Sequence, residues 1–449
     1  MKRLIKPLPW QAAFFLLPFS FLLITACPDP PKDNTPERDT TIHLEVLSTF
    51  TTTAKLYISV DDTTAEWTFG LTRNGEDVLT ATVYNNDTTF TDGGLNPGTQ
   101  YTYQAQWLDD GIAVDSSLNV VTQTMDTTSH NFVWEIDTLG EYGSYLNDVA
   151  IIDENNIWVV GNIETVSGEY NAAKWDGSEW ELMVIYSNTL DLYSIQYFNE
   201  DDIWVTDYCS PIHWDGNVWT LYHLQNLGLD ACAGNAIRGT SSSNIYFVGN
   251  GGSIVHYDGS EFTKMESGTE VDLEDIDGTE DGEHLIVSGF DLFGYNNTSP
   301  LLHIHNGEIT KVYESTYPWG NEEDWGRIEA IEVIGDTVYL STWGRDWIAY
   351  NYLTGEAREY LYNSIPEFYG MRMVDVCSNG INDILLAGAF PATLHFNGVS
   401  WMRDNQVFDL FGENNFIVEK SDMNNNVVVM VGRFYGNAGG VIARGYRIQ

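Results

Sequence analysis

The segment Ile157-Trp158-Val159-Val160-Gly161, followed by Trp175-Asp176-Gly177-Ser178-Glu179-Trp180, contains the two elements from which most of this chain is built. The first is a short apolar run typical of a buried β-strand. The second places Asp-Gly, one of the strongest signals for a tight hairpin turn, between two tryptophans. Because residues on either side of such a turn pair across the two strands, the tryptophans are expected to pack together.

Both elements recur along the chain. Further copies of the apolar run begin at Ile203, Ile245, Leu285, Val338, Ile384 and Val428. Copies of the hairpin occupy Trp214–Trp219 and Tyr257–Phe262, with weaker ones at His305–Ile309 and Phe396–Trp401. The spacing, roughly 40 to 53 residues, is that of a four-stranded propeller blade.

The two ends of the repeat region complement each other. The last repeat ends over 440–449 with a third strand and no fourth, whereas Phe132-Val133-Trp134-Glu135-Ile136 precedes the first repeat as an unpaired strand. Placing this strand on the last repeat leaves no open sheet edge. We therefore expect an all-β chain in which residues 131–449 form a seven-bladed β-propeller closed by its N-terminal strand. Six and eight blades are the alternatives, because the fourth and fifth repeats are irregular.

Residues 41–125 have the pattern of a smaller β-domain. Arg73-Asn74-Gly75-Glu76 predicts a type I′ hairpin, and Leu95-Asn96-Pro97-Gly98-Thr99-Gln100-Tyr101 follows a predicted strand. The second motif resembles the late strands of fibronectin type III domains, and Tyr101 matches their corner tyrosine. The resemblance implies a spacer or interaction module of the sandwich class, in which Trp67 fills the place of the family's early-strand tryptophan.

The N-terminus is typical of an export signal. Lys2, Arg3 and Lys6 precede an apolar stretch, so residues 1–26 are interpreted as a signal peptide. Leu23-Ile24-Thr25-Ala26-Cys27 resembles the lipobox of bacterial lipoproteins, which implies that Cys27 is lipid-modified and begins the mature protein. Residues 27–40 would be a proline-rich tether. The expected location is the bacterial cell envelope, at the outer membrane.

The charge of the chain limits its partners. It has 65 acidic and 20 basic residues, a formal charge of −45, and without residues 1–27 the 17 remaining basic residues give −48. Such acidity opposes binding to nucleic acids or anionic lipid surfaces. Membrane contact is therefore expected through the N-terminal lipid alone, and a monomer is expected.

Three cysteines remain after Cys27. Cys209 and Cys232 are predicted to lie on loops of the same propeller face and are a candidate disulfide, as expected in an oxidising compartment. Cys377 is then an unpaired, buried residue. Their spacing contains no zinc motif.

The loop face is the candidate ligand-binding surface, because it carries aromatic residues beside scarce arginines. The candidates are Trp319, Trp325, Trp343, Arg345, Trp347, Arg433 and Tyr435. Exposed aromatics with arginine are typical of binding hot spots. The alternative is that these rings fill space between enlarged blades.

No cofactor, metal site or catalytic motif is expected. His213, His256 and His395 occupy equivalent positions in different repeats and so cannot converge on one ion. The acidic stretch 272–283 is interpreted as a solvated loop between the first and second strands of the fourth blade, with Ca²⁺ binding as the alternative.

These observations favour a lipid-anchored binding or scaffold protein that presents its propeller face to a protein or glycan. The alternative is a polysaccharide-active hydrolase or lyase with carboxylates at the channel mouth. A weaker third hypothesis is an assembly factor for membrane complexes.

Overall fold

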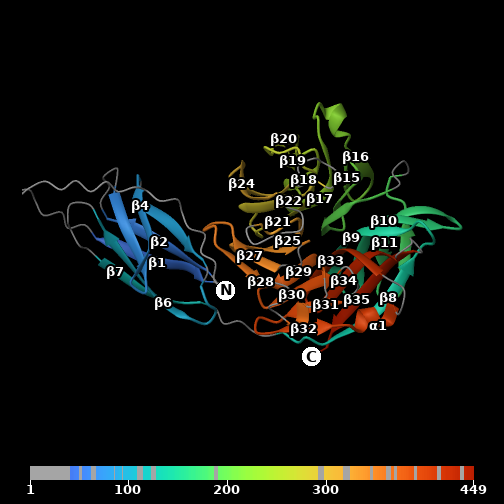
Figure 1. The fold of residues 1–449 in the computed structure, drawn as a ribbon. Helices are drawn as coiled ribbons and strands as arrows, with labels where there is room; N and C mark the ends of the chain where they lie inside the picture. Colours follow the sequence, from blue (N-terminus) through green and yellow to red (C-terminus); the bar gives the residue numbers. More distant parts are fainter. Residues whose placement is uncertain are drawn as a thin grey trace, which may run out of the picture. The chain divides into compact units, whose positions relative to one another are not determined.

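The computed structural model divides the chain into two compact units (Figure 1). The described residues are 41–49, 53–61, 67–84, 86–93, 95–108, 115–122, 128–186, 191–291, 298–316, 324–343, 347–360, 366–368, 372–388, 392–411, 416–434 and 439–448. Cys27 and the predicted signal peptide and tether lie outside them. Within these limits the first unit comprises 41–48, 55–91 and 100–120, and the second comprises 49–54, 92–99 and 121–448. No helix in the described ranges has the length and apolar character needed to cross a bilayer.

The first unit consists of two sheets, ordered β1-β2-β5 and β4-β3-β6-β7. Its strands are β1 (Ile42–Thr49), β2 (Ala54–Val60), β3 (Trp67–Arg73), β4 (Glu76–Val83), β5 (Asp87–Asp92), β6 (Gln100–Trp107) and β7 (Asp115–Val121). In the second sheet, β3 pairs antiparallel with β4 and β6. Alternate residues of β2 and β6 are buried, so each sheet buries one face. Trp67 and Tyr103 are among the largest fully buried side chains. The predicted turn joins β3 to β4 with positive φ at both Asn74 and Gly75, as a type I′ turn requires.

The second unit is built from seven four-stranded antiparallel sheets, numbered here in chain order. Sheet 1 contains β9 (Tyr145–Asp153), β10 (Asn156–Thr165), β11 (Gly168–Trp175) and β12 (Trp180–Met183). Sheet 2 contains β13 (Ser194–Asn199), β14 (Asp202–Thr206), β15 (Pro211–Trp214) and β16 (Trp219–Leu221). Sheet 3 contains β17 (Cys232–Ser241), β18 (Asn244–Asn250), β19 (Ser253–Tyr257) and β20 (Phe262–Glu266). Sheet 4 contains β21 (Leu273–Gly278), β22 (His284–Gly289), β23 (Ser299–His305) and β24 (Glu308–Ser315). Sheet 5 contains β25 (Ile328–Ile334), β26 (Thr337–Thr342), β27 (Trp347–Asn351) and β28 (Ala357–Tyr360).

Sheet 6 contains β29 (Met373–Gly380), β30 (Asp383–Gly388), β31 (Thr393–Phe396) and β32 (Trp401–Asp404). Sheet 7 contains β33 (Phe416–Asn424), β34 (Val427–Phe434), β35 (Gly440–Arg447) and β8 (Phe132–Leu139). In sheet 7, β8 pairs with β35 and supplies the fourth strand, where the sequence predicts it. Short helices η2 (Leu224–Leu227), η3 (Pro366–Phe368) and α1 (Gln406–Phe411) lie between sheets.

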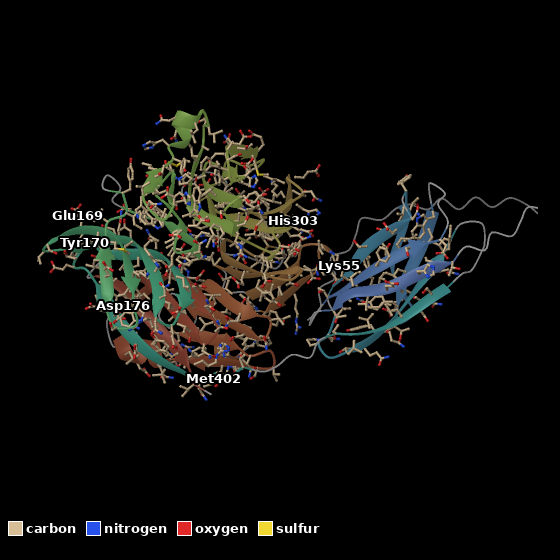
Figure 2. All side chains as sticks on the ribbon, turned by 180° about the vertical axis from the view of Figure 1, so that it is seen from behind. Lys55, Glu169, Tyr170, Asp176, His303 and Met402 are labelled. Atoms are coloured by element: carbon tan, nitrogen blue, oxygen red, sulfur yellow. A yellow bond between two sulfur atoms is a disulfide. The ribbon has the colours of Figure 1, made fainter. Side chains whose placement is uncertain are left out.

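The first strands of the sheets pack side by side in chain order, from β9 through β13, β17, β21, β25 and β29 to β33, and β33 contacts β9 again. The series therefore returns to its start. Loops between second and third strands, and connections between sheets, lie on one face, which we call the mouth face. The turns between third and fourth strands lie on the other: Figure 2 shows Asp176 at the opposite end of β11 from Glu169.

The predicted hairpins form with their aromatic pairs in register. Trp175 faces Trp180 and Trp214 faces Trp219, with ring centroids 5.5 and 5.4 Å apart. The turn glycine of the first hairpin, Gly177, has a backbone φ of 95°, which residues other than glycine rarely adopt. In sheets 1 and 2 these aromatic pairs lie on the third and fourth strands, whereas the first strands line the centre of the unit.

Candidate functional site

A cavity of about 810 Å³ lies at the centre of the second unit and is lined by residues of all seven first strands. It contains nine acidic and five basic side chains. The acidic ones are Asp148, Glu274, Asp275, Asp277, Glu329, Glu332, Asp375, Glu419 and Asp422; the basic ones are Arg238, Arg327, Arg372, Lys420 and Arg433. Five of the chain's 20 basic residues are thus gathered in one place.

Pairs of consecutive polar residues enter the cavity because the first strands bulge. In β21, Leu273 pairs with Gly289 and Asp275 pairs with Ser288, so Glu274 is the extra residue of a β-bulge. The same shift leaves Glu419 as the extra residue before Lys420 in β33. A bulge re-aims side chains that strict alternation would turn away. Related shifts in the other sheets give the extra residues Asn147, Glu329 and Val374.

Glycines in the second strands permit these bulges. A Cβ added to Gly289 would lie 2.2 Å from the carbonyl oxygen of Asp272, and one on Gly161 would lie 2.2 Å from that of Tyr145. Both are impossible contacts, so the first strand approaches its neighbour this closely only where glycine stands. These glycines end the apolar runs that the sequence repeats.

Farther from the mouth face than the bulges, most cavity carboxylates accept hydrogen bonds from a neighbouring sheet. Asp148 accepts hydrogen bonds from the Ile195 N–H at 2.9 Å and the Ser194 hydroxyl at 2.7 Å, which joins sheet 1 to sheet 2. Asp375 accepts the Ser421 hydroxyl at 2.7 Å, and Asp422 accepts the Ile151 N–H at 2.8 Å. Comparable bonds from Gly239 to Gln196, from Ile331 to Asp275 and from Ser378 to Glu332 join further sheets. These side chains hold the ring together.

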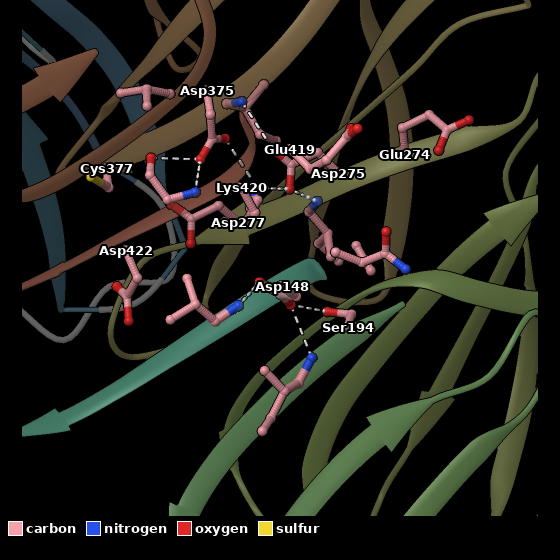
Figure 3. A pocket seen from close by; sticks show the side chains of 18 of the residues that line it. Asp148, Ser194, Glu274, Asp275, Asp277, Asp375, Cys377, Glu419, Lys420 and Asp422 are labelled. Carbon is pink, nitrogen blue, oxygen red and sulfur yellow. Dashed lines mark hydrogen bonds and ion pairs between the residues drawn. The ribbon is translucent and has the colours of Figure 1, made fainter. Parts of the chain in front are cut away.

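Lys420 is the centre of this lower group (Figure 3). Its ammonium donates a hydrogen bond of 3.1 Å to Asp275 and lies 3.4 Å from Asp375. Burial alone would lower the pKa of Lys420, but attraction from Asp275, Asp375 and Asp148 outweighs burial and leaves the pKa well above its ordinary value. Burial raises the pKa of Asp148 and of Asp375 to about 6, against the opposing attraction of Lys420.

The upper part of the cavity, which we call the mouth arc, carries the residues that these bridges do not use. Its charged side chains alternate in sign around sheets 4 to 7. They are Glu274, Arg327, Glu329, Arg372, Glu419 and Arg433. Glu329 lies 3.0 Å from Arg327 and 3.3 Å from Arg372, and Glu419 lies 3.0 Å from Arg433.

Two aromatic rings accompany the arginines of the mouth arc. The guanidinium of Arg372 lies 3.4 Å from the centroid of the Trp343 ring, and that of Arg327 lies 5.0 Å from it. Arg327 also lies 3.3 Å from the centroid of Phe290. Such cation–π contacts hold the guanidinium groups in place. The side chains of Arg372 and Arg433 are 33% and 35% exposed, so a partner can reach them.

The structure brings together only some of the residues that the sequence singles out. Trp343 and Arg433 belong to the mouth, whereas Trp319, Arg345 and Tyr435 lie outside the described residues. Trp325 is 8% exposed and stacks on Tyr313, and Trp347 is 1% exposed and packs on Tyr339. For these two, the expectation of an exposed ring is wrong, because both fill hydrophobic clusters next to the sheets.

The cysteines and histidines have structural surroundings. Cys209 and Cys232 form a disulfide between the β14–β15 loop and the start of β17, and Cys377 is free and buried. His213, His256 and His395 each bond within their own sheet, to Asp202, Asn244 and Asp383. Within the described part of the chain, no group of three or more His, Cys, Asp or Glu residues is arranged to hold a metal ion.

The interpretation of 272–283 as a solvated loop is wrong. Residues Leu273–Gly278 form β21, the innermost strand of sheet 4, and only the following residues form the turn before β22. Asp275 and Asp277 therefore face the cavity instead of solvent. Sequence reasoning also missed Lys420, Arg327 and Arg372. Lys420 stands in an acidic context, and the arginines stand just before first strands. The glycine that ends the apolar run marks the positions of Lys420 and Arg372, whereas the run of sheet 5, near Arg327, has no such glycine.

Comparison with known proteins settles the architecture. No protein-family model and no curated protein matches the chain. A structure of YCF48 bound to a D1 peptide is similar with a TM-score of 0.53 and 16% identity, covering 72% of this chain and 100% of that one. YCF48 from Cyanidioschyzon merolae gives 0.50 and 14%, covering 70% and 98%. U3-55K gives 0.50 and 8%, covering 72% and 100%.

The second unit has a β-propeller fold. At these identities the likeness shows the fold alone. The cavity therefore lies at the centre of a propeller.

Proposed function

We propose that this chain is a binding or scaffold protein whose propeller holds a segment of a partner protein at the mouth arc. One observation carries the proposal: the mouth arc groups arginines and aromatic rings at an open cavity, and none of its arginines bridges neighbouring sheets through the backbone. Arginine and tryptophan are the residues most enriched in binding hot spots. The YCF48 structure with a bound peptide provides a precedent for peptide binding by a similar fold.

The proposal includes the wider organisation of the chain. The seven sheets would be the blades of one propeller, residues 41–125 a fibronectin type III-like spacer, and lipid on Cys27 the anchor to the bacterial envelope. The sheet orders of both units and the lipobox-like Leu23–Cys27 support these parts of the proposal. Protease shaving of intact native cells tests the location: digestion means a surface-facing propeller, and protection until the outer membrane is permeabilised means a periplasmic one.

The binding proposal is tested by photo-cross-linking in native envelopes. A photoreactive residue replaces Tyr208, which is 58% exposed on the mouth face with its ring centroid 6.0 Å from that of Tyr193, a cavity residue. The matched control replaces Val399, which is 74% exposed in a turn on the opposite face. We expect a discrete protein adduct from position 208 and none from 399. Equal adducts from both positions, or none from either, would contradict the proposal, and a protease-resistant adduct would indicate a glycan.

A second candidate function is polysaccharide hydrolysis or elimination by the cavity carboxylates. The observation that favours it is the raised pKa, about 6, of Asp148 and Asp375, since general acids need a pKa near the working pH. Against it, both carboxylates are occupied by bonds to the next sheet. Turnover of any polysaccharide that is lost in Asp375→Asn, with the variant still folded, would establish this alternative in place of the first.

A further inference from the structure

The mouth arc contains charges of both signs, so the ion pairs within it decide which charge a ligand must carry. Arg327 and Arg372 both contact Glu329, and Arg433 contacts Glu419. An anionic ligand would have to displace these pairs, and it would approach a chain with a formal charge of −45. The arginines therefore complete the wall of the cavity, and the carboxylate that they leave unpaired is the point of interest.

Glu274 is that carboxylate. Among the described residues it forms no ion pair, and its hydrogen-bond partner is the side-chain amide of Asn235, at 3.2 Å. It is half-buried, it lines the cavity, and it is the extra residue of the β21 bulge. Figure 3 shows its carboxylate apart from the group around Lys420. Arg327, whose charge attracts Glu274, is already paired with Glu329. The neutral amide and this shared guanidinium leave the charge of Glu274 only partly balanced.

The chain itself shows what this cavity accepts. The ammonium of Lys420 is a lysine group already bound within the same cavity, held by carboxylates at 3.1 and 3.4 Å. A cavity of about 810 Å³ has room for another such side chain above it. The aromatic ring of Tyr193 at its wall is also compatible with a cation, whereas the Phe290 ring is already covered by Arg327.

We propose that the cavity accepts the ammonium group of a lysine side chain from the partner segment, with Glu274 as its counter-ion. This inference rests on the proposed peptide-binding function and specifies its ligand. The partner segment is therefore basic, which also suits the acidic surface that it must approach. Burial, followed by the nearby Asp272, raises the pKa of Glu274 to about 7; the attraction of Arg327 opposes this rise and Asp275 adds to it. An incoming ammonium favours the ionised form, so binding releases protons near neutrality and strengthens as pH rises from about 6 to about 8.

The test uses the full chain purified in detergent and three acetylated, amidated pentapeptides that differ only at the central residue: lysine, norleucine or glutamate. Norleucine keeps the aliphatic stem without the ammonium. Calorimetry in two buffers of different ionisation enthalpy measures affinity and proton release together. The variants are Glu274→Gln and, as a matched control, Glu181→Gln, whose side chain is exposed on β12.

We expect the lysine peptide to bind about tenfold more tightly than the norleucine peptide at low salt, with proton release near pH 7. In Glu274→Gln the preference and the proton release are lost, whereas Glu181→Gln keeps both. Equal binding of lysine and norleucine, or tighter binding of glutamate, would overturn this inference and leave the peptide-binding function intact. Failure of all three peptides to bind would count against both.

Discussion

The ammonium of Lys420 on β33 donates a hydrogen bond of 3.1 Å to Asp275 on β21, which lies three sheets away around the ring. The same ammonium lies 3.4 Å from Asp375 in the neighbouring sheet 6. One side chain thus spans the centre of the propeller and joins carboxylates that each also accept a hydrogen bond from a backbone N–H of an adjacent sheet. The centre is held by charge and hydrogen bonds, whereas the spaces between sheets are held by apolar packing.

Replacing Lys420 with methionine should destabilise the propeller. The change leaves Asp275 and Asp375 in the cavity without their cation, and removing one partner of a largely buried pair costs about 2–4 kcal/mol when some exposure is allowed for. Chemical denaturation at about pH 7.5 measures the loss. Lys311→Met is the control, because Lys311 pairs with Glu314 on the surface and should cost at most about 1 kcal/mol. Similar losses in both variants would show that the central ammonium has no special part in stability.

Asp148 and Asp375 should contribute more stability to the wild-type chain as the solution is acidified from about pH 7.5 to about pH 5. Asp148 and Asp375 have folded-state pKa values of about 6, above the ordinary 3.8. The folded state therefore binds more protons than the unfolded state between these values, and the unfolding free energy increases as pH falls through about 6. Two such groups contribute roughly 1–3 kcal/mol over that range. Part of this gain is offset below about pH 6.5 by His130, His256, His284 and His303, because burial lowers their pKa values and the unfolded state then binds more protons.

Surface repulsion in a chain of charge −45 has the same sign and must be separated from the buried contribution. Thermal unfolding is therefore followed at about 0.5 M NaCl, where the Debye length is about 4 Å and exposed charges are screened. The pH dependence should persist at that salt concentration. A dependence that vanishes with salt would assign it to the surface and not to Asp148 and Asp375.

The propeller could be predicted from the sequence because its signals are local and repeated. The hairpin between Trp175 and Trp180 needs only an Asp-Gly turn and two aromatic residues. The pairing of β8 with β35 followed from counting strands at the two ends. Burial of Trp325 and Trp347 could not be read in the same way, because an aromatic residue beside a loop has the same local sequence whether it faces solvent or a neighbouring sheet.

The cavity was harder to predict because β-bulges interrupt the two-residue alternation. Glu274 and Asp275 are consecutive and both line the cavity, so the strand that contains them has the composition of a solvated loop. The glycine that ends five of the seven apolar runs is the signal that sequence reasoning overlooked. Gly289 marks the point at which β21 bulges, and Gly432 does the same for β33.

Gly289→Ala tests that explanation. The new Cβ would stand 2.2 Å from the carbonyl oxygen of Asp272, so β21 must shift away and the bulge that presents Glu274 must change. Overpacking of this kind costs about 1–3 kcal/mol, measured by denaturation. Gly70→Ala in the first unit is the control, since its nearest neighbour is a Leu108 side-chain carbon at 3.6 Å. If Gly289→Ala unfolds like the wild type, the glycine is not required for the bulge.

Trp343 and Trp325 offer a pair of substitutions that separates binding from folding. Trp325→Ala empties a buried site beside Tyr313 and breaks the bond from its indole N–H to Glu359, so it should cost about 3–5 kcal/mol of stability. Trp343→Ala removes a half-buried ring that two guanidinium groups contact, and it should cost about 1–2 kcal/mol. It should nevertheless abolish most of the photo-adduct formed from position 208, because Arg327 and Arg372 lose the ring that positions them at the mouth. Unchanged adduct yield in Trp343→Ala, in protein shown to be folded, would place the partner elsewhere on the propeller.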